Sequence, residues 1–210
     1  ATMNAALVTL PASAQVNSLK MLIYNGSSSG TLALGSNSLN VISGGIRSLY
    51  PAQITGSAVS HLTAGGSAST AELFLVSGGL TVSANITDNP GPDGEYDPVP
   101  GGPRDADNGR VSLVAAGAVT LSGINTYTGT TYAYGSITVS ASSAADGPVV
   151  VDGTGFAVTG TTPAVIGDLT LYHGQVSGPL NATVDNVQTG SIANGITGSA
   201  PIIKSSDFSA

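Results

Sequence analysis

A short unit, two apolar residues around one intervening residue, recurs along most of the chain and constrains the fold more than any other feature. An extended strand places the two apolar side chains of such a unit on one face and the middle side chain on the other. Glycine or clustered Ser and Thr interrupt almost every window long enough for the apolar stripe of a helix. The units are 32–34, 39–41, 73–75, 80–82, 111–113, 119–121, 137–139, 149–151, 156–158 and 169–171. They predict an all-β protein made of very short strands.

The spacing of these units distinguishes between β architectures. Several units form pairs whose starts are 7 or 8 residues apart, with Gly, Ser or Asn in nearly every gap. Short strands joined by tight polar corners are typical of a β-solenoid, in which each coil stacks on the previous one. A sandwich usually has longer strands of about five to six residues and large core fillers, whereas this chain has no Trp, seven Tyr and three Phe. We predict a parallel β-helix with coils of roughly 20 residues, and a β-sandwich with tight hairpins is the alternative.

Asparagines lie near the expected corners of the coils. Their side-chain amides are suited to bridging one coil to the next or to occupying left-handed corner positions. Ordinary turn asparagines are the alternative interpretation. The residues concerned are Asn17, Asn37, Asn40, Asn85, Asn125 and Asn181.

Composition excludes several functional classes. Charged residues make up 8% of the 210 residues and hydrophobic residues 41%, which excludes charge-driven disorder. The formal net charge is −7 with only five Lys and Arg, so the chain cannot neutralise a row of phosphates and we expect no nucleic-acid partner. Cysteine is absent, which removes disulfides, Cys-based zinc sites and thiol nucleophiles. No segment approaches the roughly 18 consecutive apolar residues of a transmembrane helix.

The chain divides into four expected segments: an apolar N-terminal arm (1–15), solenoid coils (16–87), an inserted loop (88–110) and further coils (111–210). The first residue is Ala1 rather than Met, from which we expect a processed, secreted protein. The arm is apolar enough to form a strand, and a solenoid leaves an open strand edge at its end. We therefore expect the arm to pair with the edge of a neighbouring subunit. The residues expected to make that contact are Ala1, Met3, Ala5, Leu7 and Val8.

The inserted loop is the strongest local anomaly in composition. It contains six of the twelve acidic residues together with five prolines and five glycines, which predicts an irregular loop between two strands. Alternating carboxylates are ligands that calcium accepts. The alternatives are a solvated acidic loop and a subunit contact in which Arg104 or Arg110 pairs with a carboxylate. The candidate calcium ligands are Asp88, Asp93, Glu95, Asp97, Asp105 and Asp107.

Catalytic motifs are not recognisable in the sequence. His61 and His173 occur without a motif, and there is no nucleophile elbow, phosphate loop or zinc-protease signature. We therefore predict no catalytic residues and no enzymatic activity. Three tyrosines, Tyr127, Tyr132 and Tyr134, lie within eight residues. Exposed tyrosines can stack on sugar rings, so these three are candidate ligand-binding residues, with structural packing as the alternative.

One stretch carries a family resemblance. Residues Gly117–Thr131, with the sequence GAVTLSGINTYTGTT, and the following Gly135–Val139 resemble the autotransporter-associated β-strand repeat of bacterial surface proteins. Upstream, Asn17–Leu19, Leu32–Ile46 and His61–Gly65 are similar to the segments that precede this repeat. The resemblance implies a right-handed β-helix outside a bacterial cell. Because the repeat is a folding motif, it implies no catalytic residues.

Together these patterns predict a non-enzymatic structural protein located outside the cell or on a bacterial cell surface. We expect it to self-associate into a homopolymer, as the subunit of a filament, sheath or layer that assembles through open solenoid edges. An adhesin or glycan-binding passenger module, with surface glycans as partners, is the alternative.

Overall fold

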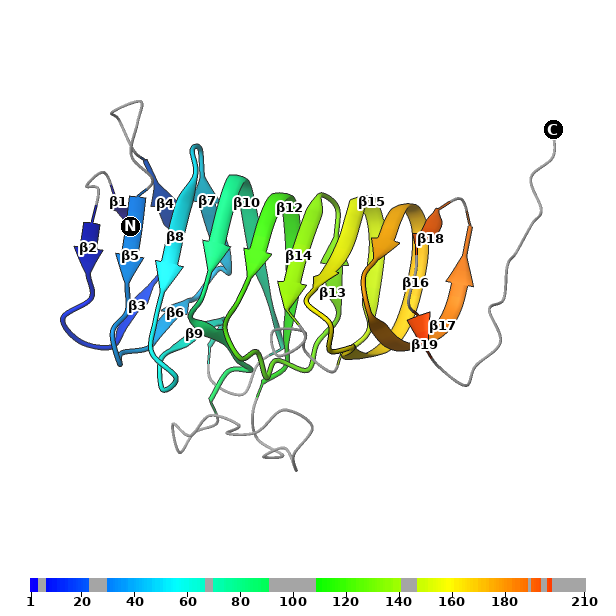
Figure 1. The fold of residues 1–210 in the computed structure, drawn as a ribbon. Coiled ribbons are helices and arrows are strands. Elements are labelled where there is room, and N and C mark those ends of the chain that lie inside the picture. Colours follow the sequence, from blue (N-terminus) through cyan, green and yellow to red (C-terminus); the bar gives the residue numbers. More distant parts are fainter. Residues whose placement is uncertain are drawn as a thin grey trace.

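The chain is all-β over the residues that the structure describes. The computed structural model describes residues 1–3, 7–22, 30–66, 70–90, 109–140, 147–188, 190–193 and 196–197. These ranges contain no helix, and hence none that could cross a membrane. Figure 1 shows the strands side by side in one elongated stack, with β1 and β2 at one end and β17 and β19 at the other.

The strands form two sheets. The smaller one contains β3 (Ala14–Val16), β6 (Leu39–Val41), β9 (His61–Ala64) and β11 (Asn85–Ile86). The larger one contains β1 (Thr2–Met3), β2 (Leu7–Thr9), β4 (Leu19–Met21), β5 (Gly30–Ala33), β7 (Gly45–Ser48), β8 (Ala52–Thr55), β10 (Ala71–Val82), β12 (Val111–Leu121), β13 (Thr131–Ala133), β14 (Ser136–Ser140), β15 (Val149–Thr159), β16 (Ala164–Ser177), β17 (Leu180–Val187), β18 (Ser191–Ala193) and β19 (Ile196–Thr197). Each of the named strand pairs is parallel, whereas sandwiches are typically antiparallel.

The register between paired strands is nearly constant in the middle of the chain. Leu113 pairs with Thr131, and Thr131 pairs with Val149, so each step is 18 residues. We call the chain between two such positions a repeat. Ala71 instead pairs with Val111, a step of 40 residues, which is 22 more than 18. The excess coincides with segment 88–110, and Asn89 forms an antiparallel bridge with Gly109 at its base. The chain therefore leaves and re-enters the stack at one place, and strand pairing continues on either side.

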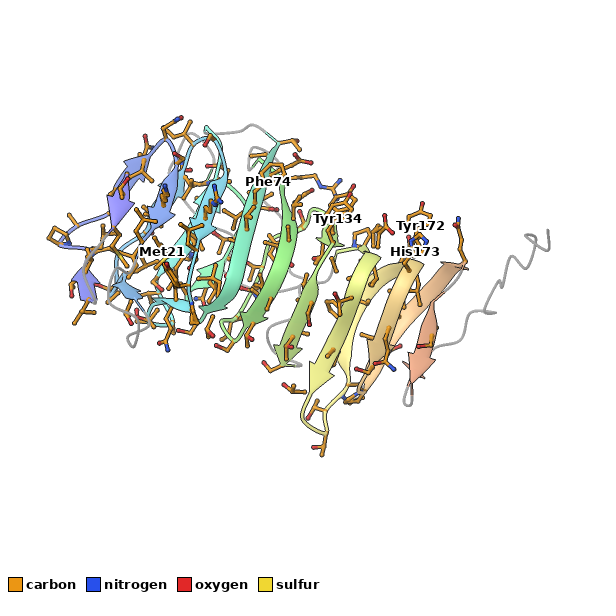
Figure 2. The ribbon with its side chains drawn as sticks, turned by 90° about the horizontal axis from the view of Figure 1, so that it is seen from above. Met21, Phe74, Tyr134, Tyr172 and His173 are labelled. Carbon is orange, nitrogen blue, oxygen red and sulfur yellow. The ribbon has the colours of Figure 1, made fainter. Side chains whose placement is uncertain are left out.

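The core is built from the apolar units that the sequence displays. Leu73 and Leu75 on β10 pair with Leu113 and Ala115 on β12, and all four side chains are fully buried. Figure 2 shows that Met21 lies inside the stack. Since side chains alternate across a strand, the residues between the apolar ones face outward.

Several strands are longer than the sequence predicted. Units 73–75 and 80–82 lie within one strand, β10, of 12 residues. The strand bends at Gly79, which has a φ of 149°, and its register against β12 shifts between Ser77 and Leu80. A glycine without a Cβ permits this conformation, so the chain turns a corner without ending the strand.

The N-terminal segment is part of the sheets rather than a separate arm. β1 pairs with β4, β2 pairs with β5, and β3 pairs with β6, all within one chain. Met3 is buried in the core, Val8 packs partly against it, and Leu7 is 62% exposed. Ala5 lies outside the described residues. This segment therefore satisfies the backbone groups on the edges of β4, β5 and β6 within its own chain, and its expected contact with a neighbouring subunit stays a prediction.

A column of glycines lines one corner of the stack. Gly117, Gly135, Gly153 and Gly174 are spaced 18, 18 and 21 residues apart. A Cβ added at Gly135 would lie 2.1 Å from the carbonyl oxygen of Gly117, and one added at Gly174 would lie 2.0 Å from that of Gly153. Backbone stacks directly on backbone here, so a side chain has no room.

We predict that Gly135→Ala lowers the free energy of unfolding by about 1–3 kcal/mol, because the new methyl group must displace the backbone of the neighbouring repeat. Gly45→Ala is the matched control, since its Cβ would meet nothing closer than 3.7 Å and should cost less than about 0.5 kcal/mol. Denaturant unfolding of both variants measures the difference, and equal losses would contradict direct backbone stacking at this corner.

Candidate functional site

Asp88 closes the base of the inserted segment. Its side chain is fully buried, and Oδ1 accepts hydrogen bonds from the backbone N–H of Val111 at 2.7 Å and of Thr128 at 3.0 Å. Its Oδ2 accepts a third from the Thr128 hydroxyl at 2.6 Å. The carboxylate thus ties the residues before the insertion to those after it. These bonds give Asp88 a structural role.

The calcium prediction stays untested. Asp93, Glu95, Asp97, Asp105 and Asp107 lie outside the described residues, as does Arg104. Within the described ranges, no group of three or more His, Asp or Glu side chains is arranged to hold a metal ion.

Arg110, the other residue expected at a subunit contact, uses its guanidinium within its own chain. Nη2 donates to the carbonyl oxygen of Thr128 at 2.8 Å. Arg110 and Asp88 therefore both bind the segment around Thr128. This convergence fixes the position at which the inserted segment returns to the stack.

Asparagine amides bridge neighbouring repeats at three of the six positions that the sequence analysis singled out. Asn37 Nδ2 donates to the carbonyl oxygen of Leu10, and Asn85 Nδ2 to that of Ala58, each at 2.8 Å. Asn125 Oδ1 accepts from the N–H of Ile86 at 2.8 Å. Backbone groups at these corners are satisfied by side chains where no strand continues.

A row of neutral polar side chains runs across the smaller sheet. Asn40 on β6 pairs with Thr63 on β9. Thr87 directly follows β11, whose last residue, Ile86, pairs with Leu62 on β9. The three are buried, and Asn40 Oδ1, Thr63 Oγ1 and Thr87 Oγ1 have no hydrogen-bond partner. The row thus holds buried acceptors whose bonding capacity the described residues do not use.

The two histidines lie in different sheets and environments. His61, on β9, is partly buried, and this burial lowers its pKa from 6.5. His173, on β16, lies 2.6 Å from Asp152 through Nδ1 and Oδ1, and its side chain is 67% exposed. This exposed pair was not predicted, although the 21-residue separation is close to one repeat and places the two residues in register.

The three candidate tyrosines divide into two groups. Tyr127 is 2% exposed, its hydroxyl lies 2.7 Å from Thr131 Oγ1, and burial raises its pKa to about 12. It belongs to the core and so is not part of an exposed ligand surface. Tyr132 and Tyr134 instead stack with ring centroids 6.2 Å apart and planes 6° from parallel. Tyr134 is 51% exposed, so this pair lies on the outer face.

Comparisons with known protein families, curated proteins and solved structures find no match to this chain. The resemblance to the autotransporter-associated repeat therefore stays a prediction.

We predict that Asp88→Ala destabilises the fold by about 2–4 kcal/mol, because it leaves the buried N–H of Val111 and the partly buried N–H of Thr128 without an acceptor. Asp88→Asn is the matched control, since its Oδ1 can still accept from both groups. Thermal and denaturant unfolding measure the two losses. If Asp88→Ala were no worse than Asp88→Asn, the proposed role of these bonds would be wrong.

The lowered pKa of His61 predicts a loss of stability in acid. The folded chain binds a proton at His61 less readily than the unfolded chain, so this contribution is complete above the unfolded pKa. It declines as the pH falls below about 6.5 toward the folded pKa. Melting temperatures at about pH 7.5 and about pH 5.5 should therefore differ more in the wild type than in His61→Gln. An identical difference in both proteins would contradict this assignment.

Proposed function

We propose that the chain is a right-handed parallel β-solenoid that serves as a non-enzymatic structural subunit outside a bacterial cell. The support for the solenoid is the parallel pairing at a step of 18 residues over consecutive repeats. The handedness follows the strong general preference of parallel crossover connections. The location rests on the resemblance found in the sequence.

The single observation that carries the structural role is the exposed edge formed by β1, β2 and β3. Among the described residues, each of these strands pairs on one side only, with β4, β5 and β6. Parallel edges with unpaired backbone groups are templates for further strands. A second copy of the chain that adds strands here would extend the stack.

The hydrogen bonding of β2 identifies which of its N–H groups face that edge. The N–H of Leu10 donates to the carbonyl oxygen of Ala33, at the end of β5, at 2.8 Å. Donors alternate in direction along a strand, so the N–H of Thr9 points away from β5 and toward the open side. Thr9 is itself exposed. Its N–H is therefore available to a neighbouring copy.

Assembly through this edge is head-to-tail, because the surface on the second copy differs from the edge itself. Contacts of this kind produce open filaments unless the rotation between copies closes a ring. We therefore assign the chain to a filament, sheath or layer.

A second candidate function is glycan binding, as in an adhesin. The observation that favours it is the exposed, stacked pair of Tyr132 and Tyr134 on the outer face. This candidate is independent of the edge contact, and both could operate in one protein.

We predict that the protein forms concentration-dependent polymers and that Thr9→Pro suppresses them, because proline has no N–H to donate at the edge. Thr9→Ala keeps the N–H and should assemble like the wild type. Sedimentation velocity with electron microscopy measures assembly, and melting temperature confirms that each variant is folded. A wild-type protein that remains monomeric at every concentration would contradict the proposal, as would equal assembly by Thr9→Pro.

A further inference from the structure

Exposed aromatic and aliphatic side chains form a stripe on the outer face of the larger sheet. Phe74 pairs with Val114, Val114 with Tyr132, and Tyr132 with Val150, so this row crosses four successive strands. Val76 and Tyr134 each lie two residues further along their chain, on the same face. Figure 2 shows Phe74, Tyr134 and Tyr172 along one side of the ribbon. We define the aromatic stripe as Phe74, Val76, Tyr132, Tyr134, Val150 and Tyr172.

The side chains of the stripe are accessible. Phe74 is 36% exposed, Val76 44%, Tyr134 51% and Tyr172 36%. Val114 points outward but is only 8% exposed, since it lies between the positions of Phe74 and Tyr132. Exposed apolar side chains that gather on one face, rather than being scattered singly, are a feature of interaction sites.

The surroundings of the stripe are polar, and its centre is uncharged. From β10 to β13, the row through Phe74 and the row through Val76 contain no charged side chain. Arg47, the partner of Val76 on β7, lies beyond one end. Asp152 follows Val151 on β15 and His173 follows Tyr172 on β16, so this exposed pair lies beside the last two strands of the stripe. Ser112 flanks the stripe, and its hydroxyl accepts from the N–H of Thr130. Glu72, the partner of Ser112 on β10, is exposed on the same flank. The carboxylates of Glu72 and Asp152 border the stripe and disfavour an anionic ligand. A ligand for this surface should therefore carry no negative charge and should have both apolar faces and hydrogen-bonding edges.

The dimensions of the stripe favour a narrow, extended ligand over a protein. Two residues of one strand that share a face are about 7 Å apart, and the five strands from β10 to β16 span about 19 Å. This area is far below the roughly 800 Å² per partner that a stable protein interface buries. A single polymer chain that runs along the stack fits it better.

We propose that the aromatic stripe binds an extended neutral polysaccharide along the axis of the stack. Sugar rings present C–H groups on their faces and hydroxyls at their edges. The faces pack on Phe74, Tyr134 and Tyr172, because aromatic rings offer large contact areas with a polar handle on tyrosine. Regular strand spacing provides contacts at regular intervals, which matches a ligand with a repeating unit. A phosphate polymer is disfavoured by the net charge of −7. This inference rests on the second candidate function and specifies its ligand and residues.

Affinity electrophoresis of the full chain in native gels tests the proposal. The probes are hydroxyethyl cellulose, a neutral extended β-glucan, and carboxymethyl cellulose, which has the same backbone with negative charges. We expect hydroxyethyl cellulose to retard the wild type, and carboxymethyl cellulose to retard it less. Tyr134→Ala and Phe74→Ala should each weaken binding to hydroxyethyl cellulose by about tenfold, as truncation of an aromatic contact usually does. Melting temperatures verify that both variants are folded.

The matched control is Tyr50→Ala, which removes a tyrosine that is 53% exposed and lies outside the stripe. It should bind like the wild type. No retardation by hydroxyethyl cellulose would overturn the proposal, and so would equal retardation of Tyr134→Ala. In the second case glycan binding stands and only its site is wrong. Equal retardation by carboxymethyl cellulose would overturn the assignment to a neutral ligand. If Tyr134→Ala lost self-association and the wild type bound neither polysaccharide, the stripe would be a contact between copies.

Discussion

Parallel pairing of each repeat with the next, in constant register, is the constraint on which the rest of the structure depends. Once Leu113 lies beside Thr131, and Thr131 beside Val149, the pleat decides which side chains face the core and which face solvent. A residue must therefore suit its neighbours in the column as well as its own strand. The glycine corner at Gly117, Gly135 and Gly153 shows the strictest case, because there backbone contacts backbone.

The same register explains how a long insertion is tolerated. Strand pairing resumes at Val111 after a step of 40 residues because the insertion begins and ends at one place. Asp88 secures that place with three hydrogen bonds to residues after the insertion. A buried carboxylate whose acceptors are used in this way stabilises a specific connection rather than offering a vacant ligand.

The sequence predicted the all-β class and much of the core, because apolar alternation is a local signal. It did not predict that β10 continues around a corner, since the bend at Gly79 depends on the neighbouring strands. The glycine column was visible as an 18-residue spacing, but its meaning required knowledge of which backbones stack.

The candidate sites were predicted only in part, because their residues meet through strand pairing that the sequence does not reveal. Tyr132 and Tyr134 share a face as strand alternation requires, whereas Tyr127 is buried by packing that spacing alone does not reveal. The aromatic stripe extends the pair to Phe74 and Tyr172, which are distant in the sequence. Only the register between strands brings these side chains onto one surface. His173 and Asp152 meet in the same way.

Distances between paired spin labels test the stacked arrangement most directly. The chain has no cysteine, so labels can be placed at Gln53, Ala157 and Ser177 without interference. Pairing connects Gln53 to Thr81, Thr120, Thr138, Ala157 and then Ser177. A stack with about 4.8 Å between strands predicts backbone separations near 19 Å for Gln53 and Ala157 and near 24 Å for Gln53 and Ser177. A distance that fails to increase from the first pair to the second would contradict the stack.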